Sequence, residues 1–476
     1  MRFLNSRLVL AVGIVSIPSL WGMDLQEAFL AAEQHDASWL ATQEELHASL
    51  EGEQQALSAL LPNFSAQATL SSNRINPTEP IPSFGLYNRS FTNKTYGVQA
   101  MQPLFNAGIW RAYHQAQALT SQAKAEFEAA QQEFILKVAT AYFSVLRAQE
   151  NLAYAGAEQQ ALGRQLEQMR KRFEVGMASI TEVHEAQAAF DTSVADRIGA
   201  QSSVSTAEAQ LDLLTGGGSD HLAILSNDAP VHDAPKEPES FWVQQAESHN
   251  PQIIADRFAY QASQASTKEN RAAYLPTLSL VSQWQHVDTG GADPLQDGRN
   301  AMIGVQLNVP LYSGGAIPSR VRQALAQEYA ARDRLDFAKR QTEQQTHASY
   351  LLVQTDAARV KARQQAVSSS EMALVATQAG YDVGTRDIVE VMQAQKDLYA
   401  ARSAYANARY DYVLDGLKLK ASAGLLSNMD IRQLNGWLDN KASININSLN
   451  PELQVPVEQG PTPVVPKGIP TPRRHS

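Results

Sequence analysis

The chain has 476 residues, a formal net charge of −10 and no cysteine. Its length allows more than one ordinary domain, and its negative charge gives no electrostatic support to a nucleic-acid partner. Without cysteine, the chain cannot form disulfides, thiolate metal sites, cysteine nucleophiles or a lipidated N-terminal cysteine.

Residues 1–22 have the features of a secretory signal peptide. Arg2 and Arg7 give a basic start, a mainly apolar stretch follows over residues 8–17, and small residues offer a cleavage zone near residues 19–23. The apolar stretch is shorter than the roughly 20 residues of a membrane-spanning helix, so we favour a signal peptide over a membrane anchor. The mature protein is therefore expected to work outside the cytoplasm.

Four windows contain no Asp, Glu, Lys or Arg, unlike the rest of the chain. The windows are residues 62–73, 95–110, 276–287 and 300–319. Parts of them alternate with a period of two, as Phe64 and Leu70 or Ile303 and Val305 illustrate, so one face is apolar and the other polar but uncharged. A tilted strand needs about 9–11 residues to cross a bilayer. A soluble hairpin with one buried face would show the same pattern, but four paired windows in one secreted chain favour transmembrane strands.

Very long helices follow each pair of windows. Residues 107–172 contain no proline and are rich in good helix formers, so this helix would be on the order of 100 Å long. Apolar residues recur every seven positions in the outgoing and the returning helices. They are Val138, Val145, Leu152, Leu166 and Phe173; Val183, Phe190, Val204 and Leu211; Val353, Val360, Val367, Leu374 and Tyr381; and Val391, Leu398, Tyr405, Tyr412 and Leu419. These heptads predict long antiparallel coiled-coil hairpins.

The chain is internally duplicated. The matching blocks are residues 32–36 with 246–250, 61–62 with 275–276, 97–99 with 304–306, 103–105 with 310–312, 173–176 with 381–384, and Gly216 with Gly424. Their common order predicts two repeats of one architecture, each with a helix, a strand pair and a long helical hairpin. A Gly- and Pro-rich stretch over residues 216–238 joins the two repeats.

These features divide the chain into consecutive parts. The parts are a signal peptide over residues 1–22, a first repeat over 23–216, a linker or equatorial segment over 217–245, a second repeat over 246–424, and an equatorial and disordered C-terminal tail over 425–476. Because the residues after 440 are rich in Asn and Pro, we expect the tail to be disordered or wrapped around the waist of the molecule.

Both the strands and the helices require partner chains. A sheet edge in hydrocarbon leaves backbone groups unsatisfied, so membrane strands must close into a barrel, and the smallest bacterial barrels use about eight strands. One chain with four strands cannot close such a barrel, and long heptad faces also need neighbours to cover them. We therefore expect a symmetric ring of chains around a pore.

Other functional classes explain fewer of these features. A periplasmic adaptor has long hairpins but needs no repeated strand pairs, and a secreted structural coiled coil needs no uncharged strands. A hydrolase needs a catalytic constellation, and none stands out. His35, His47, His114 and His184 lack metal-ligand spacing, and residues 216–219 lack the Lys of a phosphate loop. We expect no enzyme activity, no catalytic residues, no metal site and no cofactor.

The order of elements, the Leu-Pro strand starts and the paired segments 173–176 and 381–386 resemble the TolC family of outer-membrane channel proteins. The resemblance extends over about residues 23–424, and its most specific part is residues 381–395. It implies a mainly α fold with a membrane β part. In this fold, three chains form an α-barrel of long antiparallel coiled-coil helices, and they share a transmembrane β-barrel with four strands from each chain.

The resemblance also implies a function and a location. Such proteins lie in the outer membrane of Gram-negative bacteria, extend into the periplasm, and are the exit ducts of tripartite export systems. They pass drugs, small molecules or polypeptides from an inner-membrane pump of RND, ABC or MFS type, to which a periplasmic adaptor (membrane fusion) protein connects them. The expected partners are thus a homotrimer, an adaptor, a pump and outer-membrane lipid, with no nucleic acid.

The resemblance further implies an iris-like gate at the periplasmic end of the helices. In the family, a tyrosine and an arginine before the last helix link to the neighbouring hairpin, and the matching residues are Tyr381 and Arg386. Their expected partners in the first repeat are Thr181 and Glu182. The alternative is that Glu182, Arg386 and also Glu390 are ordinary solvated charges on their helices.

Two acidic residues one helical turn apart form the constriction in the family, and the matching residues here are Glu390 and Gln393. Because Gln393 departs from the family pattern, the ring would hold half as many carboxylates, and we expect weaker cation selectivity than in members with both acids. The adaptor is expected to dock at the hairpin tips. These tips are Val175, Gly176, Val383 and Gly384.

Overall fold

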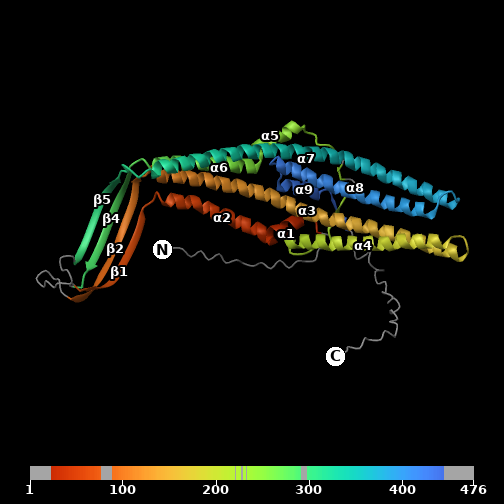
Figure 1. Cartoon of the computed structure of the whole chain (residues 1–476), viewed down its shortest axis with the longest axis horizontal. Coiled ribbons are helices and arrows are strands. Elements are labelled where there is room, and N and C mark those ends of the chain that lie inside the picture. The colour runs from red at the N-terminus through yellow and green to blue at the C-terminus, as the bar shows by residue number, and fades with distance from the viewer. Residues whose placement is uncertain are drawn as a thin grey trace, which may run out of the picture.

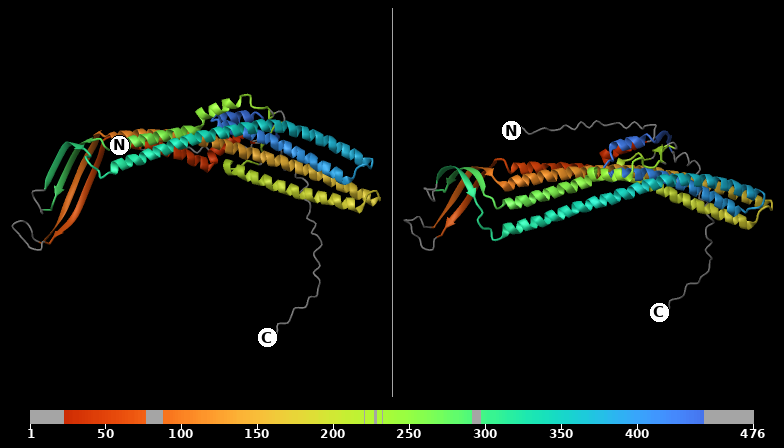
Figure 2. Two further views of the ribbon diagram at one scale, coloured as in Figure 1. Left: turned by 45° about the horizontal axis from the view of Figure 1, so that its top comes forward. Right: turned by 90° about the horizontal axis from the view of Figure 1, so that it is seen from above.

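The computed structural model describes residues 23–76, 88–219, 221–226, 229–231, 233–290 and 297–443. The predicted signal peptide (residues 1–22) and the last part of the predicted tail (residues 444–476) lie outside these residues. Figure 1 shows an elongated molecule with a four-stranded sheet at one end, from which long helices run to two hairpin tips at the other end. The sheet bends away from the long axis of the helices (Figure 2).

The order of elements occurs twice, as the duplication predicted. The first set is α1 (Leu25–His35), α2 (Ala37–Ser58), β1 (Asn63–Ile75), β2 (Arg89–Phe105), α3 (Ala107–Glu174) and α4 (Ile180–Thr215). The second set is α5 (Glu239–His249), α6 (Pro251–Ala272), β4 (Thr277–Asp288), β5 (Gly298–Asn308), α7 (Ala316–Asp382) and α8 (Ile388–Ser422). The pairs α3/α4 and α7/α8 are the two long hairpins; we call them the first and the second hairpin.

Each set begins with two helices, where the sequence analysis expected one. Asp36 separates α1 from α2, and its side chain accepts a hydrogen bond from the Ser38 backbone N–H at 2.9 Å. Asn250 separates α5 from α6 in the same way and accepts from the Gln252 N–H at 3.0 Å, with Pro251 as the first residue of α6. Asp and Asn satisfy free N–H groups at a helix start, and proline fits the first turn but not a helix interior. These residues therefore divide what the apolar pattern alone suggests is a single helix.

The four long strands form one antiparallel sheet in the order β1-β2-β4-β5. The strand bounds differ from those of the uncharged windows, most clearly in β2 and β5. β2 begins at Arg89 and includes Lys94, whose charge lies 3.7 Å from Asp288 on β4. β5 ends at Asn308, because a proline, which has no N–H to donate, and two glycines with positive φ follow before α7 begins.

Most predicted heptad positions in the helices are buried. They are Val138, Val145, Leu152 and Leu166 in α3, Val204 and Leu211 in α4, Val353, Val360 and Tyr381 in α7, and Val391, Leu398 and Leu419 in α8. Phe173 is an exception with 44% of its surface exposed, since it lies at the end of α3 where the chain turns. None of the described helices contains an apolar stretch long enough to cross a membrane.

The main hydrophobic core lies midway along the helices, where the hairpins meet α1 and α9 (Asn428–Asn435), and we call it the waist core. Its largest fully buried side chains are Leu25, Ile135, Tyr142, Phe143, Leu146, Leu211, Leu222, Tyr410 and Ile431. At this level, β3 (Ala223–Leu225) pairs antiparallel with β6 (Leu438–Ser443). The expected equatorial segment and the first part of the expected tail thus contain regular structure, and α5 begins before the expected boundary at residue 246.

Candidate functional site

One face of the sheet is apolar and exposed. Because directly paired residues lie on the same face, the register aligns the apolar residues of all four strands. They are Phe64, Ala66, Ala68 and Leu70, then Tyr96, Val98 and Ala100, then Leu280 and Trp284, and then Ala301, Ile303, Val305 and Leu307. Phe64 is 73% exposed and Ile303 is 74% exposed. β1 and β5 are open edges of the described sheet. Both the edges and this apolar face need to be covered, and the described residues do not cover them.

The opposite face of the sheet is mainly polar and rich in glutamine, although Met101 and Met302 also lie on it. Its residues include Ser65, Gln67, Thr69, Thr95, Gln99, Gln283, Gln285 and Gln306. The Gln283 side chain donates a hydrogen bond to Gln285 at 2.9 Å, so neighbouring amides partly satisfy each other. Neutral amides both donate to and accept from water, and they favour neither cations nor anions. This face therefore suits a wet passage that does not select by charge.

The two hairpins end in the same kind of turn. Gly176 and Gly384 have φ angles of 75° and 79°, and each glycine N–H donates to a carbonyl of the last helical turn, at 2.9 and 3.0 Å. Positive φ favours glycine at this position after a helix. Val175 and Val383 beside them are 69% and 76% exposed. Each of the predicted docking tips thus presents an apolar side chain on a fixed turn.

Tyr381 lies in a small apolar cluster that joins the two hairpins near their tips, which we call the tip cluster. Its buried members are Leu162, Leu166, Met169, Ala186, Tyr381, Ile388, Val391 and Met392. The Tyr381 hydroxyl accepts a hydrogen bond from Nη1 of Arg172 on α3 at 2.9 Å, and the guanidinium carbon lies 4.9 Å from the ring centre. Arg172 was not among the predicted gate residues, although it stands directly before the matched segment 173–176.

Arg386 is held beside Glu390, so a predicted link residue and a predicted constriction residue form one ion pair. The stem of Arg386 packs over Gly380, where an added Cβ would lie 2.7 Å from Cγ of the arginine. Asp387 begins α8 and accepts from the Glu390 N–H at 2.9 Å. Both members of the ion pair remain about half exposed and are therefore accessible to another chain.

Thr181 and Glu182 lie at the start of α4. The Glu182 side chain accepts from the Ser179 N–H at 2.5 Å, and the Glu182 N–H donates to the Ser179 hydroxyl at 3.2 Å, which caps the helix. Among the described residues of this one chain, no hydrogen bond or ion pair connects Thr181 or Glu182 with Tyr381 or Arg386. The predicted links are therefore not made within a single chain.

Gln393 is exposed on α8 and donates to Asp397 at 2.8 Å. Glu390, Gln393 and Asp397 are spaced three and four residues apart, so they lie along one face of the helix. Asp397 was not among the predicted constriction residues, because only Glu390 and Gln393 match the two positions of the family. The spacing could have identified Asp397, because it is an acidic residue two helical turns after Glu390 and therefore lies on the same face.

A buried carboxyl group lies between α7 and α8 near the waist core. Only 1% of the Asp356 surface is exposed. Burial, followed by the neighbouring carboxyl of Asp415, raises the pKa of Asp356 to about 7, and Asp411 adds to this repulsion. Arg359, whose Nη1 lies 2.9 Å from the Asp356 carboxylate, acts in the opposite direction. The neutral form of Asp356 is thus favoured up to nearly neutral pH.

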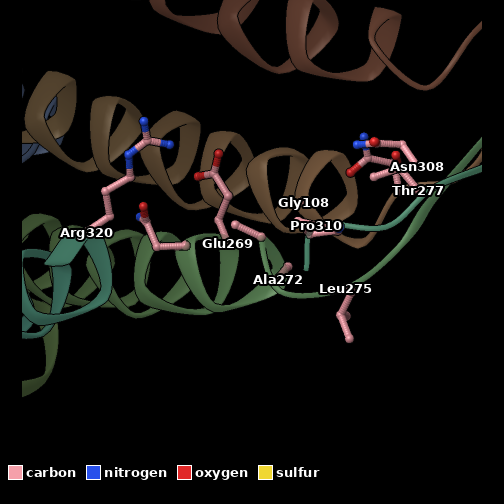
Figure 3. A pocket seen from close by; sticks show the side chains of 11 residues that line it. Gly108, Glu269, Ala272, Leu275, Thr277, Asn308, Pro310 and Arg320 are labelled. Carbon is pink, nitrogen blue, oxygen red and sulfur yellow. The ribbon is translucent and has the colours of Figure 1, made fainter. Parts of the chain in front are cut away.

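A cavity of about 340 Å³ lies where the sheet meets the helices (Figure 3), at the opposite end of the molecule from the hairpin tips (Figure 1). Figure 3 shows Glu269 of α6 and Arg320 of α7 extending to the same side, with Asn308 near the strand end. Burial raises the pKa of Glu269. One acidic and one basic side chain among neutral groups do not make a catalytic pair, so we assign no chemistry to this cavity.

Comparison with protein families gives one match over most of the chain. The family described as "Outer membrane efflux protein" matches residues 31–217 and 242–425. The chain is 33% identical over 432 residues to the outer membrane protein TolC of Vibrio cholerae, covering 90% of this chain and 96% of that protein. It is 26% identical over 438 residues to the proteases secretion protein PrtF of Dickeya chrysanthemi, covering 91% and 95% of the two chains.

A solved structure shares the fold. The crystal structure of the outer membrane protein VceC from Vibrio cholerae superimposes with a TM-score of 0.71 at 21% identity, covering 84% of this chain and 96% of that chain. At this level of identity the likeness concerns the fold alone. It agrees with the predicted combination of long helical hairpins and a membrane sheet.

Proposed function

The chain belongs to the outer membrane efflux protein family, and from this membership we propose that it forms a homotrimeric duct with a gate at its hairpin tips. As a family member it is an outer-membrane channel for efflux and type I secretion, and it is not an enzyme. It is placed in the outer membrane of a Gram-negative bacterium and extends into the periplasm. The trimer, the gate and the named partners are the proposed part.

The exposed apolar face of an unclosed sheet is the observation that supports a ring of several chains, and the number three follows the family resemblance. Four strands per chain are too few for a membrane barrel, whereas three chains side by side exceed the smallest known number of about eight. Pairing β5 of one chain with β1 of the next would satisfy both edges and place the apolar face toward lipid. The glutamine-rich face would then line the pore.

The long helices support the same assembly. Large apolar side chains are exposed along α7, with Phe337 at 64%, Met372 at 62% and Val375 at 71%, and along α4, with Ile198 at 59%. Helix faces of this kind need a neighbour, and a ring of hairpins supplies one to each. The first and second repeats of each chain would thus alternate around the tunnel wall. The first repeat would end near residue 216 and the second would begin near residue 246.

The hairpin tips are the proposed gate and docking region. In a ring, Arg386 of one chain would face Thr181 and Glu182 of the next. Arg386 and Thr181 are exposed and Glu182 is partly exposed, and no contact joins them among the described residues of one chain. Glu390 and Gln393 would then form the constriction. The exposed valines Val175 and Val383, beside Gly176 and Gly384, would contact a periplasmic adaptor that connects the channel to an inner-membrane pump.

The cargo is proposed to be small molecules or polypeptides. The relative named as a proteases secretion protein favours polypeptides, whereas the family description names efflux. The neutral glutamine face supports a passage that accepts cargo of either charge, because neutral amides hydrogen-bond without selecting charge.

Single-channel conductance in a planar bilayer tests the proposal. The purified wild-type protein is expected to conduct weakly, and the Tyr381→Phe/Arg386→Ser double variant is expected to conduct much more, because two tip links are lost. An equal conductance in both forms would disprove the gate. A correctly inserted protein that never conducts in either form would disprove the duct.

A further inference from the structure

Polar contacts between the two hairpins of one chain are concentrated at two levels. Near the waist, Arg147 of α3 pairs with Asp411 of α8 at 2.6 Å, and Asn151 accepts a hydrogen bond from Ser403 at 2.7 Å. Near the tips, the contact is the hydrogen bond from Arg172 to Tyr381. Among the described residues between Asn151 and Met169, no hydrogen bond joins the two hairpins. The contacts in this stretch are mainly apolar, beside an electrostatic attraction between Glu158 of α3 and Lys396 of α8.

The Arg172–Tyr381 contact has two components. The guanidinium donates to the hydroxyl at 2.9 Å and also lies 4.9 Å from the ring centre, within the range of a cation–π interaction. The Tyr381 hydroxyl in turn points to the sulfur of Met169 at 3.5 Å, so both of its hydrogen-bonding roles are directed to α3. Because Tyr381 is only 9% exposed, water competes little for these contacts.

Arg172 has no acidic partner among the described residues, and its contact leads out of its own hairpin, unlike the contacts of its two neighbours. Arg170 donates to Gln187 at 2.6 Å and Lys171 pairs with Glu167 at 2.6 Å, and both of these contacts stay within the first hairpin. The contact of Arg172 is the one that crosses to the second hairpin. An arginine suits this role because its planar group can donate and lie over a ring at the same time, which the ammonium of lysine cannot do as well.

We propose that Arg172 is a gate residue that holds the second hairpin of each chain against the first through Tyr381. This inference rests on the proposed gate and adds a latch within each chain to the links between chains. Release of the latch would free the α7 end from α3, while the links of Arg386 to the next chain would remain. Opening would thus require two independent contacts to break, one inside each chain and one between chains.

The conductance of the full trimer tests the latch with matched variants. Arg172→Ala is expected to shift the closed–open equilibrium toward open by about tenfold, as for the loss of a hydrogen bond to a charged group. Arg172→Lys keeps the charge and should recover only part of this effect. The control Arg170→Ala removes the same charge two residues away, but breaks a contact within one hairpin, and should leave the conductance at the wild-type level.

Double variants separate a specific latch from a general loosening of the tip. Arg172→Ala and Tyr381→Phe remove the same hydrogen bond, so their combination should open the channel much less than the product of the single effects. Arg172→Ala and Arg386→Ser break different contacts, and their effects should multiply. Circular dichroism should show that every variant keeps its helix content.

Two results would overturn the latch. One is equal opening by Arg170→Ala and Arg172→Ala, which would indicate a general charge effect. The other is an Arg172→Ala channel that stays closed while Arg386→Ser opens; this would refute the latch and leave the proposed gate intact. If Arg386→Ser and the Tyr381→Phe/Arg386→Ser double variant also remain at the wild-type conductance, the proposed gate fails together with the latch.

Discussion

The waist and the hairpin tips are built from the same four long helices, yet they are held together very differently. At the waist, the buried Tyr142 hydroxyl donates its proton to the backbone carbonyl of Ala223 at 2.8 Å, and the carbonyl of Met23 lies 3.1 Å from the same hydroxyl. Lys420 there pairs with Asp430 of α9 at 2.5 Å, and a short sheet crosses the helices. The tips have one small apolar cluster and the bond from Arg172.

The difference shows where such a molecule can move. Coiled-coil pairing holds each hairpin together along its length, but it does not fix one hairpin against the other. That fixation comes at the waist from segments far apart in the sequence, which include α1, β3 and α9. Regions with fewer buried contacts open at lower free energy, so we expect the tips to move and the waist to stay rigid.

The largest expected effect comes from truncating the waist core. Ile135, which is 1% exposed on α3, is packed among residues of the waist core, and Ile135→Ala should lower the free energy of unfolding by about 2–5 kcal/mol. Thermal melting followed by circular dichroism at a helical wavelength measures it. A melting temperature equal to that of the wild type would show that the waist is not the structural anchor.

The same substitution at the tip should act locally. Ile388 is fully buried in the tip cluster, so Ile388→Ala also removes buried apolar contacts, but in a region that opens on its own. We expect faster hydrogen–deuterium exchange in residues 160–176 and 380–392 and a smaller drop in melting temperature than for Ile135→Ala. Equal global destabilisation by both substitutions would remove the distinction between waist and tip.

A moderate, pH-dependent change in the melting temperature is expected when Asp356 near the waist is replaced. The raised pKa of Asp356, about 7, means that the folded state keeps a proton that the unfolded state releases near its ordinary value of 3.8. Stability from this group is therefore greatest at low pH and falls as pH rises from about 4 to about 7. Asp356→Asn should raise the melting temperature more at pH 8 than at pH 5.

A matched control checks that prediction. Asp333 lies exposed on the same helix, so Asp333→Asn should change the melting temperature little at either pH. If Asp356→Asn lowers the melting temperature at pH 8, then Asp356 contributes as a charged partner of Arg359, and the account of its neutral form is wrong.

The smallest expected effect concerns ion selectivity at the tip. Gln393→Glu adds a carboxylate to the α8 face that holds Glu390 and Asp397, and it should raise the cation-to-anion permeability ratio by about twofold. Glu390→Gln should lower the ratio, because it removes charge from the same face. Reversal potentials in a salt gradient give both ratios. Unchanged ratios in both variants would place this face of α8 outside the pore.

Much of this architecture could be predicted from local patterns. The period of two identified the membrane strands, because one face needs apolar residues, and the heptads identified the hairpins, because their faces pack on other helices. The contacts of the waist could not be predicted, because they do not follow from a periodic pattern. The pairing of Leu225 with Leu438 joins segments far apart in the sequence, and neither segment carries a periodic signal of its own.

The candidate site shows the same limit at the level of single residues. Tyr381 and Arg386 were found because they stand in a motif, while Arg172 stands next to one and has a role only through the residue that it contacts in space. The division between α1 and α2 was missed because Asp36 looked like one polar residue in a helical pattern, although its side chain caps the second helix. Contacts and caps depend on geometry that periodicity does not encode.

Distances between spin labels test the central claim, that the tips open while the waist stays fixed, most directly. The chain has no cysteine, so Val383→Cys at the tip and Glu247→Cys on α5 at the waist can each be labelled without other changes. Each labelled protein is compared with and without the Tyr381→Phe/Arg386→Ser substitutions. With them, the distances among the three Val383→Cys labels of a trimer should lengthen by several ångströms. The distances among the Glu247→Cys labels should not change. Equal changes at both levels, or no change at the tip in a variant that conducts more, would contradict the account.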